Sequence, residues 1–379
     1  MEKITFTCET ITPMFIAGAD GQTPELRAPS IKGALRFWWR AVNGHLSLKE
    51  LKEREAEIFG GTNPARRSSV SVRIDFNKKH LTEKTILEGQ PSNYVDQFKN
   101  HFNLAWENFN RAYQGKDAAI TYLFYSVLFQ GKRPFIDIGL KFDIIFTSRS
   151  QECLKKVVAT FWLLVHFGGI GTRTRRGAGA FAANVKEDEK NLLREWDIKF
   201  GDNQKNEIAD FVQNNYQKVI NLIKIESNSK KNTFTNLIDP SIFVSNHAEN
   251  LSWNTVLSEV GKPFMEYRTR NKHKWDKMAI FGLPIRHKRG TVQIRKKNRR
   301  ASPLIISLFK VNGVLNWVVI KMGGNFNIKH SSNDIEDLDV IMKKRGKIEN
   351  GTASHQILEN FIMKEIKPIS KEIKSQDNE

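Results

Sequence analysis

One stretch of the chain limits its possible folds more than any other. From residue 136 to residue 146 every second residue is apolar, which is typical of a strand with one buried face. The alternating residues are Ile136, Ile138, Leu140, Phe142, Ile144 and Phe146. Residues 151–167 then place apolar side chains at helical spacing, and Gly168-Gly169 is a natural C-terminal stop. The run "GAFAANV" at 179–185 predicts a further strand.

The same kinds of element occur earlier in the chain. Residues 3–9 alternate, "SIKGALRFWWRAV" at 30–42 predicts an amphipathic helix capped by Ser30, and "SSVSVRIDF" at 68–76 alternates again. The order strand, helix, strand, strand, helix, strand is that of the ferredoxin-like unit. The fold class predicted is therefore α+β.

The length of 379 residues favours two or three domains. We expect an N-terminal ferredoxin-like domain over 1–185, with a helical insertion at about 92–130, and a second domain of the same kind over 186–379. In the second domain we expect a helix near 206–224, a basic loop over 262–300 and a hairpin whose Asn312-Gly313 suits a type I′ turn. Two helices near 333–346 and 353–366 are expected to close the chain.

The charge balance favours a polyanionic partner. The chain has 60 Lys and Arg against 41 Asp and Glu, a formal net charge of +19. Such an excess attracts nucleic acid first and an anionic membrane surface second. Residues 262–300 alone hold fourteen Lys and Arg against two acids, with aromatic residues between them. That mixture suits single-stranded nucleic acid, although a basic loop at a subunit contact would look the same.

The segment "GGIGTRTRRGAG" at 168–179 has five glycines and three arginines. It lacks the G-K-[ST] of a P-loop, and it follows a helix instead of a strand, so it is not a dinucleotide fingerprint. We interpret it as a turn where glycine lets a phosphodiester backbone approach and arginine grips it. The alternative is a helix cap with solvated arginines. Lys32, Arg36 and Arg40 recur every four residues on the first helix and could line the same groove.

Signals for catalysis, metals and membranes are weak. Cys8 and Cys153 are the two cysteines, no histidine pair has metal-ligand spacing, and the N-terminus lacks an apolar signal core. We therefore expect no metal, no cofactor, no membrane association and a cytoplasmic location. Two candidates for catalysis remain: Asp20 in "GADGQTPEL", more simply a turn-forming residue, and His45 after the first helix.

Four blocks resemble one family. "TPMFIAGADGQTPELRAPSIKGALRFWWRA" at 12–41 resembles the N-terminal signature of the RAMP-superfamily first subunit of type III-B CRISPR Cmr effector modules. "GGIGTRTRRGAGAF" at 168–181 resembles the glycine-rich loop of that superfamily, and "FGLPI" at 281–285 and "RRASPLIISL" at 299–308 resemble later family blocks.

The resemblance implies two ferredoxin-like, RRM-like domains in a cytoplasmic ribonucleoprotein complex for antiviral defence. Its partners would be the CRISPR guide RNA, near its 3′ region, target RNA and other RAMP subunits. The family's target cleavage lies in other subunits, so the protein is expected to bind RNA without catalysis. Two other hypotheses stay open: a RAMP-type endoribonuclease that processes guide RNA, and a basic scaffold with incidental RNA contact.

The residues expected to contact RNA come from the first helix, the glycine-rich loop and the basic segment. They are Lys32, Arg36, Arg40, Gly168, Gly169, Gly171, Arg173, Arg175, Arg176, Gly177, Arg286, Lys288, Arg289, Arg299 and Arg300.

Overall fold

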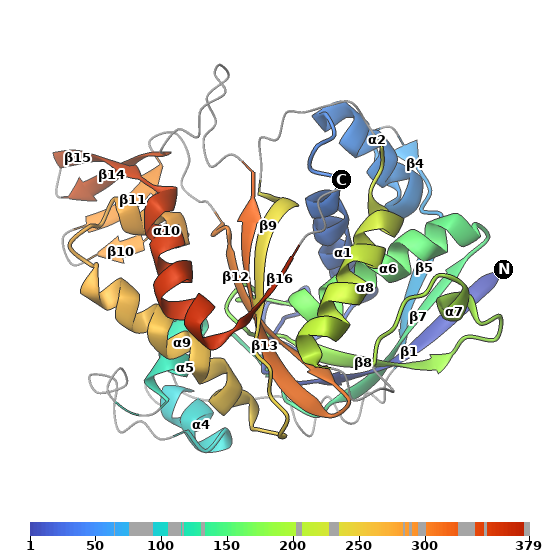
Figure 1. Ribbon diagram of the computed structural model, residues 1–379, viewed down its shortest axis with the longest axis horizontal. Helices are drawn as coiled ribbons and strands as arrows, with labels where there is room; N and C mark the ends of the chain where they lie inside the picture. Colours follow the sequence, from blue (N-terminus) through green and yellow to red (C-terminus); the bar gives the residue numbers. More distant parts are fainter. Residues whose placement is uncertain are drawn as a thin grey trace.

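The computed structural model describes residues 1–63, 65–75, 94–104, 115, 117–129, 133–201, 207–226, 235–282, 285–287, 290–294, 301–324, 338–344 and 347–374. Its elements form three four-stranded antiparallel sheets and the helices between them (Figure 1). We name these the first sheet, the second sheet and the small sheet.

The first sheet confirms the ferredoxin-like topology expected of the N-terminal half. Its strand order is β5-β7-β1-β8, and each neighbouring pair is antiparallel. The strands are β1 (Glu2–Thr10), β5 (Val70–Asp75), β7 (Lys141–Ser148) and β8 (Phe181–Glu187). The crossovers are α1 (Ala28–Val42) and α6 (Gln151–Phe167). Helix α2 (Leu48–Phe59) follows α1 and begins with a capping box formed by Ser47 and Glu50.

One prediction about α1 is wrong in detail. The helix begins two residues before Ser30, with Arg27 as its N-cap and Pro29 in the first turn. Proline suits this position, because the first helical N–H groups have no partner inside the helix. Ser30 therefore lies within the first turn of α1 and does not cap it. Its C-terminus at Asn43 is as expected.

The second sheet repeats the same topology. Its strand order is β12-β13-β9-β16, with helix α9 between β9 and β12 and helix α10 between β13 and β16. Its elements are β9 (Asn236–Val244), α9 (Trp253–Arg270), β12 (Leu304–Val311), β13 (Val314–Gly323), α10 (His355–Phe361) and β16 (Lys371–Ile373). The turn at Asn312-Gly313 has φ of 52° and 84°, as a type I′ turn requires.

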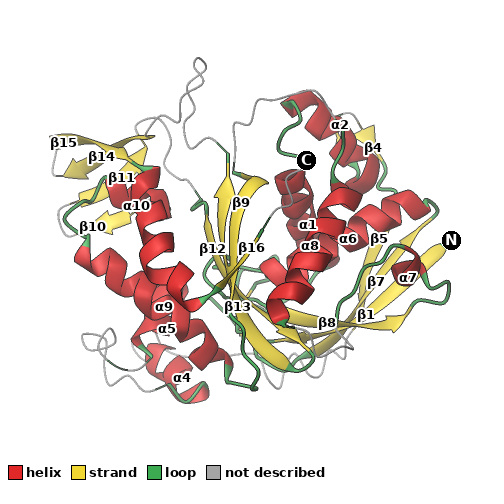
Figure 2. Ribbon diagram, in the orientation of Figure 1, coloured by secondary structure: helices red, strands yellow, loops and turns green. Residues whose placement is uncertain are grey.

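The two halves share their cores, and the sheets and helices form layers (Figures 1 and 2). Helices α1, α6 and α8 (Ile208–Ile223) lie between the first and second sheets, and one apolar cluster runs from Phe6 to Ile320. The other face of the second sheet packs on α9, α10 and α5 (Ala118–Leu128). Helices α5 and α4 (Tyr94–His101) belong to the expected insertion, so the insertion of the first half covers the second half.

The small sheet was not expected from the sequence. It has the order β10-β11-β14-β15, with β10 (Ile285–His287), β11 (Gly290–Ile294), β14 (Leu338–Lys344) and β15 (Lys347–Ala353). The helix expected at 333–346 is wrong for 338–344, because a short apolar run fits a strand as well as a helix and β15 offers it a partner. The basic loop expected over 262–300 is also wrong where the structure describes it. Apart from a turn at 271–276 and residue 282, its described residues belong to α9, a 3₁₀ turn (Lys277–Phe281), β10 and β11.

Short elements complete the described chain. They are β2 (Met14–Phe15) with β6 (Phe135–Ile136), β3 (Gly61–Thr62) with β4 (Ala65–Arg66), α7 (Leu192–Glu195), a π-helical turn (Ile362–Ile366) and a 3₁₀ turn (Lys367–Ile369). Helix α10 and the π-helical turn confirm the helix expected near 353–366.

Candidate nucleic-acid interface

A groove of about 280 Å³ separates α1 from the glycine-rich loop. Its walls come from α1, from the loop and from one residue of β12, so it lies where the two halves of the chain meet. The lining residues are Ser30, Ala34, Phe37, Trp38, Gly168, Gly169, Gly171, Thr174, Arg175 and Ile305. The first helix and the glycine-rich loop therefore line one groove.

Arg175 is the cation of this groove. Its guanidinium carbon lies 5.1 Å from the centre of the Phe37 ring, and the group donates to the carbonyl oxygen of Ser302. An arginine stacked on an aromatic ring is a favourable surface for phosphate and for bases.

The glycines of the loop serve the fold of the loop itself. Gly171 has φ of +103°, and a Cβ there would lie 2.5 Å from the carbonyl oxygen of Phe15. Gly179 has φ of +71°, and a Cβ there would collide with the carbonyl oxygen of Ile170. Gly177 has φ of +86°, and a Cβ there would lie 2.5 Å from the side chain of Leu257 in α9. The close neighbours of these glycines are protein atoms, so the fold of the loop itself requires them, and the approach of an RNA backbone to them stays a prediction.

Gly168 and Gly169 line the groove, and their inner sides are also closely packed. A Cβ at Gly168 would lie 2.6 Å from Nε1 of Trp38, and one at Gly169 would lie 2.8 Å from the carbonyl oxygen of Ala178. Both residues are buried, so their backbone is part of the packed wall of the groove.

Arg173 and Arg176 lie beneath the groove instead of in it. The Arg176 side chain donates to the carbonyl oxygens of Leu304 and Phe281, each at 2.8 Å, and the residue is 6% exposed. Arg173 donates to the carbonyl oxygen of Leu123 at 2.8 Å. Both side chains donate to carbonyl oxygens of the protein, and RNA contact by either of them stays a prediction.

The buried arginines still affect the groove through their charge. Burial lowers the pKa of Arg173 to about 10, and the neighbouring Arg268 contributes. Burial, Arg173 and Arg268 lower the pKa of Arg176 well below its usual range. Both guanidinium groups donate to backbone carbonyls, and no carboxylate of the described residues forms an ion pair with either. Their positive field therefore adds to that of Arg175.

The cationic stripe on α1 lies on a different face of the helix. Arg36 donates to Glu55 at 2.9 Å and to the carbonyl oxygen of Phe59 at 2.8 Å, so it ties α1 to the end of α2. Arg40 lies 3.4 Å from Glu55, and Lys32 donates to Ser68 at 2.9 Å. Burial and the neighbouring Arg36 lower the pKa of Lys32. Our expectation that the stripe lines the groove is wrong, because its side chains face α2 and residues 59–68.

Sequence reasoning missed Phe37, which lines the groove, and Gly33, which lies beside it on the same face of α1. Gly33 lies between Ser30 and Phe37 on one face of α1, since residues three and four apart are neighbours on a helix. A Cβ at Gly33 would meet no atom within 4 Å. Glycine in a helix costs about 1 kcal/mol relative to alanine, and no protein contact explains it here. A glycine inside an amphipathic helix was the signal that could have identified this edge of the groove.

Both candidates for catalysis have structural partners. Asp20 accepts from the backbone N–H groups of Gln22 and Thr23, and from the Thr23 hydroxyl, which lowers its pKa. It is the turn-forming residue that we favoured. His45 bonds through Nε2 to the carbonyl oxygen of Ile225 at 2.6 Å, and its Nδ1 is buried. Neither nitrogen of His45 is presented to a bound RNA.

The basic segment contributes little described surface. Arg286 lies in β10, and Lys288, Arg289, Arg299 and Arg300 lie outside the described residues. Among the residues that the structure describes, no three His, Cys, Asp or Glu side chains are grouped to hold a metal ion. In that part of the chain, no helix is long and apolar enough to cross a membrane.

The open face of the first sheet does not resemble an RNA-stacking platform. RRM domains stack bases on aromatic side chains of their sheet. In this chain that face holds Thr5 and Thr7 of β1, Arg73 and Asp75 of β5, and Asp143 of β7, and the described strands place no aromatic residue there. The groove lies on the opposite, helix side of this sheet.

Two ferredoxin-like units joined by a glycine-rich loop against the first helix define the class of protein. The sequence model of the RAMP superfamily matches residues 7–182. The CRISPR system Cmr subunit Cmr1-1 of Pyrococcus furiosus is 27% identical over 329 residues, which are 84% of this chain and 86% of that relative. Cmr subunit Cmr1-2 of the same organism is 32% identical over 196 residues, 49% of this chain and 97% of the relative.

Solved structures show the same fold. The crystal structure of Cmr1 from Pyrococcus furiosus in its apo form has a TM-score of 0.61 and 22% identity, over 98% of this chain and 99% of that one. A chain of the type III-B Cmr-beta complex bound to cognate target RNA, solved by cryo-EM, has a TM-score of 0.52 and 13% identity, over 85% and 94% of the two chains. The chain belongs to the RAMP superfamily, in the family of Cmr first subunits.

Proposed function

We propose that the protein is an RNA-binding subunit of a type III-B CRISPR effector complex, and that it binds RNA without cleaving it. Its relatives are named as Cmr subunits, and one structure of the same fold belongs to a complex with cognate target RNA. The RNA would be the guide RNA near its 3′ region, the guide–target duplex, or both, with other RAMP subunits as neighbours.

The observation that carries the proposal is the groove itself. It brings together the ring of Phe37 beneath Arg175 and the exposed backbone of Gly171, and the exposed Gly33 of α1 lies beside it. A sugar–phosphate chain needs close approach, a cation and an apolar surface against the base or ribose, and the groove offers all three. The contacts are to backbone and shape, because pairing with the guide supplies sequence specificity in such complexes.

A groove-filling substitution tests the proposal without changing charge. Ala34 lies on the groove wall, and Ala34→Trp should weaken binding of a labelled single-stranded guide RNA by about tenfold, since each displaced base is worth about 1–3 kcal/mol. Asn214→Trp, at an exposed position of α8, is the matched control and should bind normally. Equal affinities of the two variants would contradict the proposed groove. Cleavage of the free guide precursor by the purified protein, absent in His45→Ala, would instead support an endoribonuclease.

A further inference from the structure

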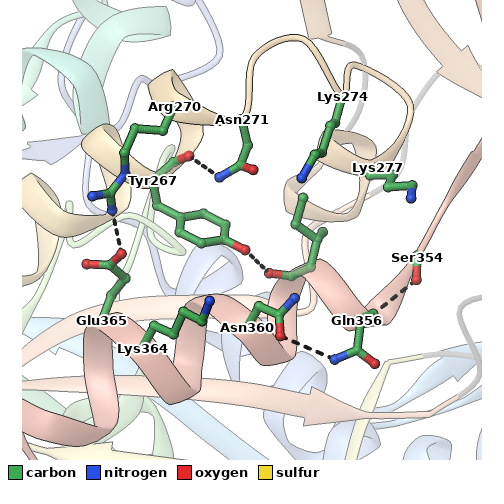
Figure 3. Close-up of a pocket in the computed structure, with 11 residues that line it drawn as sticks. Tyr267, Arg270, Asn271, Lys274, Lys277, Ser354, Gln356, Asn360, Lys364 and Glu365 are labelled. Carbon is green, nitrogen blue, oxygen red and sulfur yellow. Dashed lines mark hydrogen bonds and ion pairs between the residues drawn. The ribbon is translucent and has the colours of Figure 1, made fainter.

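A second cavity, of about 420 Å³, lies in the C-terminal half and shares no lining residue with the groove. It opens between the end of α9, the turn that follows it, and α10 with its π-helical extension (Figure 3). Nothing in the groove proposal uses these residues.

The cavity is strongly cationic. Arg270, Lys274, Lys277 and Lys364 line it, and Glu365 is the one carboxylate among its lining residues. Glu365 already has a partner, because Arg270 Nη2 lies 2.5 Å from its Oε1. The three lysines are exposed, and none of them forms an ion pair with another described residue. Three positive charges therefore face one hollow without a counter-charge.

Neutral hydrogen-bonding groups complete the walls. Asn271 donates its amide to the carbonyl oxygen of Tyr267 at 2.9 Å, which leaves its side-chain oxygen available. Gln356 donates to the side-chain oxygen of Asn360 at 3.3 Å, which leaves the Gln356 oxygen and the Asn360 amide nitrogen available. Both kinds of group can bond to a ribose or to a base edge.

Tyr267 gives the cavity a fixed apolar wall. Its hydroxyl donates to the carbonyl oxygen of Ile357 at 2.9 Å, and the residue is 7% exposed. The ring is therefore held in place between α9 and α10.

The chemistry of this set indicates its ligand. A small inorganic anion would fill only part of the cavity, whose volume of about 420 Å³ is in the range of pockets for small organic ligands. We propose that the cavity is a second nucleotide site, in which Lys274, Lys277 and Lys364 hold the phosphate and the amides of Asn271 and Asn360 contact the ribose or base. The phosphate belongs to a nucleotide in a single-stranded RNA or to a free mononucleotide, and the two arms of the test distinguish these sources.

The test uses the full chain with Lys274→Gln, Lys277→Gln and Lys364→Gln combined. The matched control combines Lys49→Gln, Lys141→Gln and Lys224→Gln, which removes the same charge from exposed positions elsewhere. In the first arm, fluorescence anisotropy with a labelled single-stranded RNA should show about tenfold weaker binding for the cavity variant than for the control. The slope of the logarithm of its binding constant against the logarithm of the salt concentration should be shallower by about 0.7 for each phosphate that the variant no longer neutralises. Arginine at the three positions should restore binding.

In the second arm, uridine monophosphate is titrated and followed by ligand-detected NMR. We expect the control and Ala34→Trp to show saturation transfer to the nucleotide, and the cavity variant to show none. That result supports the site and identifies a free nucleotide as a ligand. If only the first arm responds, the ligand is RNA. Equal behaviour of the cavity variant and its control in both arms overturns the inference. The groove proposal is judged separately. It stands if Ala34→Trp weakens RNA binding, whatever the cavity variant does. It fails if RNA binding is weakened by the cavity variant and not by Ala34→Trp.

Discussion

The guanidinium of Arg176 donates to the carbonyl oxygen of Leu304 across 2.8 Å and 128 positions of sequence. Arg176 belongs to the glycine-rich loop of the first ferredoxin-like unit, and Leu304 opens β12 of the second. The backbone makes the same connection, since the N–H of Ile306 donates to the carbonyl oxygen of Arg175 at 3.2 Å. The loop therefore joins the two units, and its position beside α1 depends on this joint.

Removing this joint should destabilise the protein. In Arg176→Met the carbonyl groups of Leu304 and Phe281 have no donor inside the core, and we expect the free energy of unfolding to fall by about 3 kcal/mol. Urea unfolding followed by tryptophan fluorescence measures it. Arg149→Met, at an exposed position, is the control and should change stability by less than about 0.5 kcal/mol. A decrease no larger than the control's would mean that the arginine does not hold the joint.

Gly33 and Gly179 should respond in opposite directions to alanine. Gly33→Ala adds a methyl group in open space on a helix, so we expect stability to rise by about 1 kcal/mol. Gly179→Ala forces a Cβ onto the Ile170 carbonyl at positive φ, so we expect stability to fall by more than about 2 kcal/mol. Thermal unfolding of both variants checks this. RNA affinity should fall in Gly33→Ala despite its greater stability, and unchanged affinity would remove Gly33 from the interface.

His166 should make stability depend on pH. Its ring is buried against Trp162, with ring centres 4.1 Å apart, and burial lowers its pKa to about 4. The unfolded chain binds the proton near pH 6.5, so the stability is fully present above that pH and is lost as pH falls towards 4. We expect this histidine to account for a decrease of about 2 kcal/mol between pH 8 and pH 5. His166→Phe should remove that part of the dependence. Parallel curves for the two proteins over this window would exclude the assignment.

Arg36 and Arg40 should differ in their contribution to folding stability, although both carry the same charge. Arg36 bonds to Glu55 and to the carbonyl oxygens of Phe59 and Gly60, whereas Arg40 is 46% exposed and lies 3.4 Å from Glu55. We expect Arg36→Met to cost about 2 kcal/mol of folding free energy and Arg40→Met less than about 0.5 kcal/mol. Neither should change RNA affinity as much as Ala34→Trp does. A larger decrease of RNA affinity in either arginine variant would favour the stripe as the interface.

The sequence predicted the parts of this structure that depend on local pattern. Alternation and helical spacing identified β1, β5, β7 and the helices between them, and Asn312-Gly313 identified the hairpin. The small sheet was missed because its strands are short, and β11 pairs with β14 across a long separation in sequence. The partners of Arg173 and Arg176 were missed for a similar reason. Backbone carbonyls carry no sequence signature, so a buried arginine and a solvated arginine look alike.

The sequence predicted which two segments meet at the candidate site more accurately than it predicted which of their residues line it. The first helix and the glycine-rich loop do line one groove, but the helix contributes Ser30, Ala34 and Phe37 to it and turns Arg36 towards Glu55. The positive charges of the basic residues had suggested the opposite face of α1. The spacing of the basic residues was real: Arg36 and Arg40 pair with Glu55 of α2, and Lys32 bonds to Ser68.

The central claim is that RNA lies in the groove between α1 and the glycine-rich loop. Photo-crosslinking of a 4-thiouridine-labelled guide RNA to the purified protein, with the crosslinked peptides mapped by mass spectrometry, tests it most directly. We expect crosslinks within residues 30–38 and 168–175, and we expect Ala34→Trp to abolish them. RNA crosslinks that fall only elsewhere, on the outer face of α2 or around residues 59–68, would contradict the claim.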